Sequence, residues 1–249
     1  MADGLSPLAV ATAWRPQRPG AQRARDIVDA LVEPDWGGLR VAVALTADEA
    51  VLLRDGHEVS VPHELQAALV AAFSAVDAVI EGHLTPKPLM GETDAPPALP
   101  KVERPPMLIP RGLLGRAKDD PFIRARDHEQ REAVQASRVP DALEQGERHA
   151  FVATDLLWVD GTPLDEIPLL ERKRWLDGVL QPSFLVRVTP YVKPTAVLTL
   201  VTWGQLGFAE LSYRAANSRY RAGAENPDWA VAPPPQGPQA PSKGPVSKG

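Results

Sequence analysis

The sequence of 249 residues contains no cysteine. Disulfide bonds and thiolate metal sites are therefore excluded, and the composition suits a reducing compartment, so we expect a cytoplasmic protein. The N-terminus has no apolar stretch behind a basic region, as a secretory signal would have. No run approaches the ~18 uninterrupted apolar residues of a membrane-spanning helix. We therefore expect no membrane partner.

Positive charge is also scarce. Lysine and arginine total 27 against 32 aspartates and glutamates, which gives a net charge of -5 and a pI near 5.6. This balance excludes a strongly basic nucleic-acid footprint over the whole surface. A local basic face remains open, because the cations are mostly arginine, whose planar head matches phosphate geometry. The hydrophobic content of 44% permits a sizeable core in one large or two small domains.

Proline, by contrast, is abundant, with 27 residues that cluster. Residues 1–25 are rich in Pro, Ala and Arg without a clear period, and we expect a flexible N-terminal arm. A Pro-rich loop is expected over residues 85–118, and a disordered Pro/Gly/Lys tail over residues 233–249. The periodic part of the sequence, residues 26–232, is expected to form one domain.

Strands and helices are expected to alternate irregularly. Strands are predicted at 40–45, 50–54, 57–61, 78–84, 150–159, 184–189 and 208–213, and helices at 62–74, 169–180 and 196–204. Residues 26–31 suggest a helical turn, and the charged stretch 120–146 is helix-prone but interrupted by Pro140. Trp158 and Trp175 are expected in the core. The absence of a regular βαβ rhythm favours an α+β fold.

Three stretches carry a specific pattern. Residues 31–43 read Leu-Val-Glu-Pro-Asp-Trp-Gly-Gly-Leu-Arg-Val-Ala-Val, in which Glu33-Pro34 favours extended backbone and Gly37-Gly38 permits a close backbone approach. Residues 151–161 read Phe-Val-Ala-Thr-Asp-Leu-Leu-Trp-Val-Asp-Gly. Residues 218–223 read Ser-Arg-Tyr-Arg-Ala-Gly, followed by Asn-Pro-Asp-Trp at 226–229. In this order, the stretches resemble the adenylation domain of ATP-dependent DNA ligases, particularly the bacterial end-joining type.

The resemblance implies the fold. It is a ligase-type nucleotidyltransferase domain, ATP-grasp-like, in which two antiparallel sheets pack together with helices outside and a cleft between them. The family usually carries an OB-fold domain after this unit. The Pro-rich residues at the end of this sequence do not resemble one, and we expect no OB-fold domain here.

The first motif departs from the family at the reactive position. The family reads Glu-Pro-Lys-Trp-Asp-Gly-x-Arg there, and its lysine attacks ATP to form a covalent lysyl-AMP. In this sequence the lysine position is Asp35 and the aspartate position is Gly37. A carboxylate repels the triphosphate and cannot form the phosphoramide bond, so we expect no catalytic residue.

Other cleft positions are kept or replaced. We expect Glu33, Arg40, Arg54, Glu81 and Arg214 to be remnants of the nucleotide cleft. The family's Asp-Gly-Glu motif reads Glu-Gly-His here, ending at His83, and Thr154 replaces the ring that stacks on adenine.

The motif Glu-Gly-Val-Val-x-Lys of the family can be placed in two ways. Anchoring it on Gly207 puts Leu206 and Leu211 at its charged positions. Counting back without a gap from Ser218 puts Ala209 and Arg214 there, which is our preferred alignment. The final family lysines are absent from residues 230–233, which read Ala-Val-Ala-Pro.

These losses predict a ligase-like pseudoenzyme, acting as a non-catalytic scaffold or accessory in bacterial DNA repair or recombination. No cofactor is expected. One alternative is an active ATP-dependent ligase or adenylyltransferase that uses a displaced lysine, such as Lys87 or Lys101, with ATP and Mg²⁺ as cofactors. A second alternative is a module that binds and senses a nucleotide without chemistry.

The predictions about partners and metals rest on weaker sequence patterns. The basic run Arg214, Arg219 and Arg221 is either a solvated face or a contact for nucleic-acid phosphates. We therefore expect DNA or a DNA-repair protein as partner and leave the oligomeric state open. The histidines at 57, 63 and 83 lie near two glutamates, but surface polarity explains them better than a metal site, and we expect no metal. Asp155 and Asp160 resemble paired carboxylates, although Asp160-Gly161 is better explained as a turn.

Overall fold

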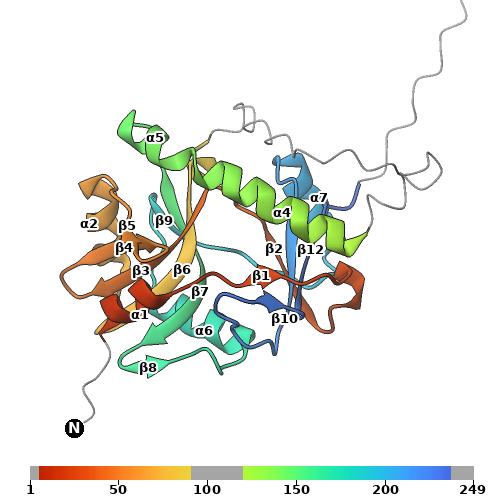
Figure 1. The fold of residues 1–249 in the computed structure, drawn as a ribbon, viewed down its shortest axis with the longest axis horizontal. Helices are drawn as coiled ribbons and strands as arrows, with labels where there is room; N and C mark the ends of the chain where they lie inside the picture. Colours follow the sequence, from red (N-terminus) through yellow and green to blue (C-terminus); the bar gives the residue numbers. More distant parts are fainter. Residues whose placement is uncertain (1–5, 91–119, 237–249) are drawn as a thin grey trace, which may run out of the picture.

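The computed structural model describes residues 6–90 and 120–236. Figure 1 shows a large sheet and a smaller sheet, with helices on the outside. The large sheet has seven strands in the order β5-β4-β3-β6-β7-β8, with β9 parallel to β7. Its strands are β3 (Leu39–Thr46), β4 (Ala50–Arg54), β5 (His57–Glu58), β6 (Asp77–Thr85), β7 (Ala150–Val159), β8 (Thr162–Pro163) and β9 (Val186–Val188).

The smaller sheet is antiparallel and has the order β12-β10-β2. It consists of β2 (Ala30–Pro34), β10 (Leu211–Ala215) and β12 (Trp229–Ala232). A two-stranded parallel pair, β1 (Arg18–Pro19) with β11 (Glu225–Asn226), lies beside it. The architecture is a mixture of helices and mostly antiparallel sheet, as the α+β prediction requires.

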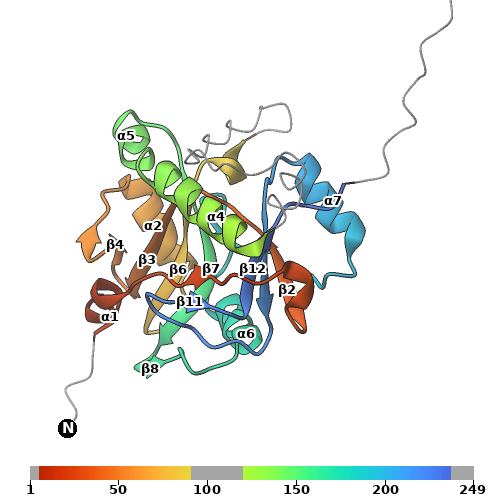
Figure 2. The same ribbon diagram turned by 45° about the vertical axis from the view of Figure 1, so that its right-hand side comes forward.

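The helices cover the sheets. They are α1 (Pro7–Ala13), α2 (His63–Ala72), α4 (Pro121–Ala136), α5 (Val139–Glu144), α6 (Leu169–Val179) and α7 (Val197–Gln205), with short 3-10 turns η1 (Ala24–Asp26) and η2 (Lys87–Leu89). In both Figure 1 and Figure 2, α4 crosses the molecule from the β3–β6 side to the β12 side. None of the helices in the described ranges is long and apolar enough to span a membrane.

The apolar runs explain the central strands. β3, β6 and β7 are buried along almost their whole length. Each contains a short apolar run, interrupted by a buried charged residue: Arg40, Glu81 or Asp155. The Asp55-Gly56 pair joins β4 to β5 with positive φ at both residues, as the hairpin signal predicts. Asp160 likewise occupies a turn with φ of 46°, and its carboxylate accepts hydrogen bonds from the Val76 and Asp77 amides.

The two sheets are joined by the short turn between β2 and β3. Gly38 in this turn has φ of +81°, and a Cβ built on it would lie 2.1 Å from the Leu84 carbonyl oxygen. Glycine is therefore required for the chain to pass from the small sheet to the large sheet beside the C-terminal end of β6. The expected close backbone approach at Gly37-Gly38 is confirmed, and it places Asp35 where the sheets diverge.

Several expectations about the elements are wrong. Residues 6–25 do not form a loose arm, because α1 packs on the large sheet and Trp14 is buried, with its indole N–H 2.8 Å from the Tyr220 hydroxyl oxygen. Residues 30 and 31 begin a strand instead of ending a helical turn. The strand expected at 208–213 begins at Leu211, and Trp175 is 42% exposed instead of buried.

Strand β12 was missed because its four residues precede a Pro-rich stretch. The Pro-rich loop expected at 85–118 and the tail expected at 233–249 lie mostly outside the described residues. Within the described part, β6 continues to Thr85 and is followed by η2.

Candidate functional site

A cleft opens where the β2–β3 turn, β10 and α4 converge. Among the described residues, its lining is mostly polar and charged: Glu33, Pro34, Asp35, Trp36, Gly37, Arg40, Glu81, His83, Lys87, His128, Arg131, Glu132, Gln135, Thr154, Ala209, Glu210, Ser212, Arg214 and Trp229. The space left open between these side chains is about 50 Å³. A buried water needs roughly 10–15 Å³ by this measure, so the cleft has room for a few waters.

The outer end of the cleft holds a cluster formed by Asp35, His128 and Glu210, which we call the outer cluster. His128 Nδ1 lies 3.1 Å from Glu210 Oε2 and 3.5 Å from Asp35 Oδ2. Burial lowers the pKa of His128, but the hydrogen bond to Glu210 and the charge of Asp35 outweigh it and raise the pKa to about 9. The imidazole is thus held between two carboxylates.

Neighbouring donors orient both carboxylates. The Gly37 amide donates to Asp35 Oδ1 over 3.2 Å, and Arg131 donates to Glu210 Oε1. The oxygens that remain, Asp35 Oδ2 and Glu210 Oε2, are the ones nearest to His128. The β2–β3 turn and α4 therefore fix the directions of the side chains in the outer cluster.

Helix α4 supplies one wall of the cleft. Its residues 128, 131, 132 and 135 recur at helical spacing and all line the cleft. Gln135 Oε1 accepts a hydrogen bond from the Gly38 amide over 3.2 Å, and a Cβ built on Gly37 would lie 2.5 Å from the same oxygen. The helix is thus locked onto the turn that joins the two sheets.

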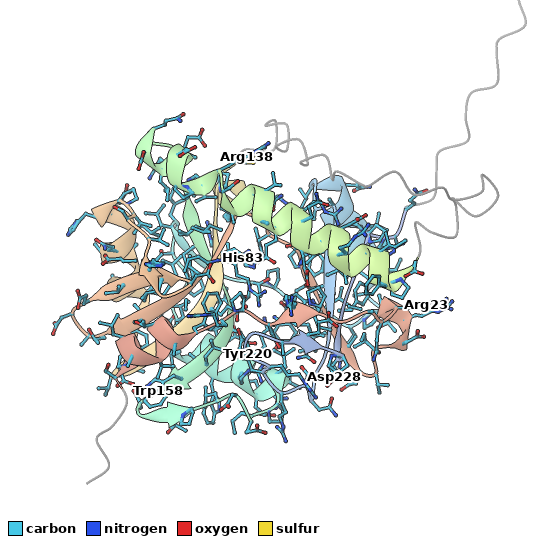
Figure 3. All side chains as sticks on the ribbon, in the orientation of Figure 1. Arg23, His83, Arg138, Trp158, Tyr220 and Asp228 are labelled. Atoms are coloured by element: carbon cyan, nitrogen blue, oxygen red, sulfur yellow. The ribbon has the colours of Figure 1, made fainter. Side chains whose placement is uncertain are left out.

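His83 lies on β6 beside this turn. Figure 3 shows it near the centre of the molecule. Burial and the nearby Arg40 charge lower the pKa of His83, and its Nδ1 lies 3.0 Å from the Gly37 carbonyl oxygen. Because a carbonyl only accepts hydrogen bonds, Nδ1 carries the proton of the neutral ring.

A network of buried ion pairs adjoins the inner end of the cleft, and we call it the inner network. Glu33 and Arg214 line the cleft, whereas the other members, Asp155, Arg172 and Lys173, do not. Glu33 pairs with Lys173 at 2.7 Å and with Arg214 at 2.6 Å. Asp155 binds Arg172 through two hydrogen bonds of 2.8 and 2.9 Å, and Arg214 at 3.3 Å. The side chains of all five residues are at most 6% exposed.

Thr154, which we expected to replace the family's adenine-stacking ring, contacts this inner network through its backbone. The Thr154 backbone oxygen accepts hydrogen bonds from Lys173 Nζ over 2.6 Å and from Arg214 over 3.1 Å. Burial lowers the pKa of Lys173, and the Glu33 charge partly opposes this change. The amine of Lys173 is therefore already paired with Glu33 and with a backbone carbonyl.

A third group connects the cleft to the N-terminal segment. Arg40 forms a buried ion pair with Glu81, whose Oε2 accepts a hydrogen bond from Tyr220. Burial and the Glu81 charge raise the pKa of Tyr220, which keeps its hydroxyl protonated as the donor. Trp14 donates to the Tyr220 oxygen, so the N-terminal segment closes this side of the cleft.

The structure brings most of the expected cleft remnants together. Glu33, Asp35, Arg40, Glu81 and Arg214 all line the cleft. The expected remnant at residue 54 stands apart, since Arg54 does not line the cleft and instead binds the Asp55 carboxylate at 3.0 Å and the Arg40 carbonyl oxygen at 2.9 Å.

The expected basic run does not form one face. Arg214 is 5% exposed inside the cleft, whereas Arg219 and Arg221 are exposed on the loop between β10 and β11. Arg214 therefore belongs to the ion pairs of the interior and not to a surface that could meet phosphates.

Two residues of the outer cluster were missed by the sequence reasoning. His128 lies in a charged helix with no family motif, and Glu210 precedes β10 at a position where the preferred alignment has a glycine. The spacing of residues 128, 132 and 135 on one helical face was the available signal. Lys173 was also missed, although it lies four residues after Leu169, on the buried face of α6.

The arrangement limits the chemistry of the cleft. The three described arginines that line the cleft, Arg40, Arg131 and Arg214, are each paired with a carboxylate. Lys87 lines the cleft with its Nζ 4.4 Å from the centre of the Phe208 ring, and burial lowers its pKa. Among the described residues, the group close enough to hold a metal ion consists of Asp35, His128 and Glu210.

No family model matches the sequence, and no curated protein matches it. Solved structures share the fold at low sequence identity. The ligase domain from M. tuberculosis LigD is 15% identical with a TM-score of 0.55, and the match covers 88% of this chain and 58% of that chain. A mycobacterial DNA ligase D complexed with ATP and MES is 15% identical with a TM-score of 0.52, covering 88% of this chain and 59% of that chain.

This chain therefore has the fold of a DNA-ligase nucleotidyltransferase domain. It matches under three fifths of the length of those structures. The likeness is one of fold, and what the cleft does must be argued from its own residues.

Proposed function

We propose that this chain is a ligase-like domain that has lost the adenylation chemistry and serves as a non-catalytic binding module for DNA in bacterial repair or recombination. The similar mycobacterial ligase was solved with ATP. In this chain, we propose, neither ATP nor another nucleotide acts as a cofactor.

The observation that carries the proposal is the environment of Asp35. In our motif alignment Asp35 stands at the position of the family's lysine. Its carboxylate accepts a hydrogen bond from the Gly37 amide and faces His128. Adenylyl transfer to the protein needs an amine that attacks the α-phosphate, and a carboxylate there adds repulsion instead. The small open space and the mutual pairing of the charged groups in the cleft also argue against a bound nucleotide.

Adenylation is tested by incubating the purified chain with α-labelled ATP and Mg²⁺ or Mn²⁺, beside an active DNA ligase. The proposal predicts that the active ligase is labelled and this chain is not. Acid-stable labelling of this chain would overturn the proposal. Calorimetric binding of ATP without labelling would instead support a nucleotide sensor.

A second candidate function is adenylation through a displaced lysine. It is favoured by one observation: Lys87 lines the cleft, and burial lowers the pKa of its amine. A lower pKa increases the uncharged, nucleophilic fraction. Under this candidate, Lys87→Ala abolishes labelling, whereas Lys193→Ala, on an exposed lysine paired with Asp29, leaves it intact. Lys101, the other displaced lysine that we considered, lies outside the described residues.

Contact with DNA has a candidate surface on the described part of the chain. A surface hollow between η1 and the start of α4 is lined by Arg23, Arg25 and Arg124, with the carboxylate of Asp120 beside them. Arginine heads in a concave surface suit backbone phosphates. The net charge of -5 predicts weak binding that falls as salt rises.

The surface is tested by mobility shift of a nicked duplex at low and moderate salt. We expect Arg23→Glu with Arg25→Glu to abolish the shift, and Arg219→Glu with Arg221→Glu to leave most of it. If Arg219→Glu with Arg221→Glu abolishes the shift and Arg23→Glu with Arg25→Glu leaves it, the DNA contact lies on the loop between β10 and β11. No shift of the unaltered chain at low salt would remove DNA from the proposal and leave a DNA-repair protein as the partner.

A further inference from the structure

We propose that Asp35, His128 and Glu210 bind one divalent transition-metal ion at the outer end of the cleft. The three side chains come from the β2–β3 turn, from α4 and from the residue before β10. The inference goes beyond the proposed function, because binding of an ion needs neither a nucleotide nor DNA.

The distances from His128 to the two carboxylates fit a common ligand sphere. Two donors that are each about 2.0–2.2 Å from one ion lie roughly 2.8–3.6 Å apart at octahedral to tetrahedral angles. His128 Nδ1 lies 3.1 Å from Glu210 Oε2 and 3.5 Å from Asp35 Oδ2. The donor atoms of all three residues lie within 4.8 Å of one another. Small side-chain adjustments bring them to one ion, which takes the place of the Nδ1 proton of His128 and releases that proton to solvent.

The surrounding groups already direct these donors. One oxygen of Asp35 is held by the Gly37 amide and one oxygen of Glu210 by Arg131, which leaves the opposite oxygens toward His128. Hydrogen bonds that hold the unused atoms of a ligand are typical of metal sites, where they fix the orientation of the ligands.

One more carboxylate oxygen in the cleft, on Glu132, accepts no hydrogen bond from the described residues. Glu132 lies one helical turn after His128 and lines the same cleft. Its Oε1 atom is enclosed, lacks a hydrogen-bond partner among the described residues, and lies 4.0 Å from an Arg40 nitrogen. A water on the ion can donate to this oxygen, and the open space of about 50 Å³ has room for such waters.

The donor set selects the class of ion. One imidazole nitrogen with two carboxylate oxygens suits Zn²⁺, Mn²⁺ or Fe²⁺, whereas Mg²⁺ prefers oxygen ligands alone. Arg131 offsets part of the charge of Glu210, and Lys87 lines the same cleft. We therefore expect weaker binding than in a closed structural zinc site.

The test is equilibrium dialysis of the untagged, chelator-treated full chain against Zn²⁺ or Mn²⁺, with bound metal measured by mass spectrometry. We expect one ion per chain, no displacement by an equal concentration of Mg²⁺, and visible ligand-field absorption when Co²⁺ is the probe. Absence of stoichiometric binding by both Zn²⁺ and Mn²⁺ would overturn the proposal.

Variants locate the ion. Asp35→Asn and His128→Asn should each weaken binding by at least about tenfold. Asp35 is the safer position, because its side chain is 21% exposed and the amide keeps an acceptor for the Gly37 N–H. Circular dichroism checks that each variant folds.

Control variants complete the test. Glu129→Gln, on the residue after His128 and facing Arg18, and His63→Asn, on an exposed histidine, should bind the ion as the unaltered chain does. Unchanged binding in Asp35→Asn, or loss of binding in either control variant, would place the ion elsewhere and contradict the proposal. The result does not depend on ATP labelling, so this inference and the proposed function can fail separately.

Discussion

The inner network and the outer cluster both contain buried charges, but these charges are compensated differently. In the inner network, Asp155 and Glu33 are enclosed and each contacts two cations. In the outer cluster, Asp35 and Glu210 share one imidazole, and their side chains are 21% and 13% exposed beside open space.

The difference separates a structural part from a part that can still bind something. A buried ion pair stabilises a fold only while every member is present, because one lost partner leaves a charge without compensation. The inner network ties α6 to both sheets through buried ion pairs. The outer cluster is less enclosed and lies beside open space, and ligand binding is expected there.

The largest effect is expected from Arg172→Ala in the inner network. Arg172 makes both short hydrogen bonds to Asp155 and also donates to the Ile167 carbonyl oxygen. Its loss leaves Asp155 with Arg214 alone, and we expect the free energy of unfolding to fall by about 3–5 kcal/mol. Urea unfolding measures the change. If the free energy of unfolding falls by less than about 1 kcal/mol, the inner network is no more structural than the outer cluster.

A smaller effect is expected from Lys173→Met in the same network. Glu33 keeps its 2.6 Å pair with Arg214, so its charge remains compensated. We expect a loss of about 1–3 kcal/mol in the free energy of unfolding. Lys193→Met is the matched control at the exposed pair with Asp29, where the change should stay within about 0.5 kcal/mol. Equal losses of unfolding free energy in Lys173→Met and Lys193→Met would contradict the expected difference between a buried and an exposed ion pair.

Acid should remove part of the stability that the inner network provides. Burial raises the pKa of Asp155, but Arg172 outweighs it and holds the pKa below 3.8. A carboxyl group with a lowered pKa stabilises the folded state above its unfolded value, and this contribution is lost as the pH falls below about 4. Unfolding free energies of the unaltered chain and of Asp155→Asn should therefore converge below pH 4. If the free energies of the two proteins differ by the same amount down to pH 2.5, ionised Asp155 does not contribute the acid-sensitive stability.

The smallest effect on stability is expected at the outer cluster. Asp35→Asn keeps an acceptor for the Gly37 amide, and its side chain is partly exposed. We expect a change of about 1 kcal/mol or less in the free energy of unfolding. Thermal unfolding without added metal measures it, and a loss as large as that of Arg172→Ala would make the outer cluster structural.

Some of the fold and the site follows from the sequence, and some does not. The short apolar runs at 41–45, 78–80 and 156–159 predict β3, β6 and β7, because buried strands carry such runs. Strand β2 was missed since it carries Glu33, whose burial becomes clear only when Lys173 of α6 and Arg214 of β10 are brought to it. Motif alignment placed Asp35 in the cleft. It could not supply His128, because α4 matches no family motif. The spacing of residues 128, 132 and 135 on one face of this charged helix was the signal left.

The most direct measurement of the central claim is the intact mass of the chain after incubation with ATP and a divalent metal. The account predicts an unmodified mass under conditions in which an active ligase acquires one adenylate. A single AMP adduct, mapped to Lys87 or to any other lysine, would contradict it.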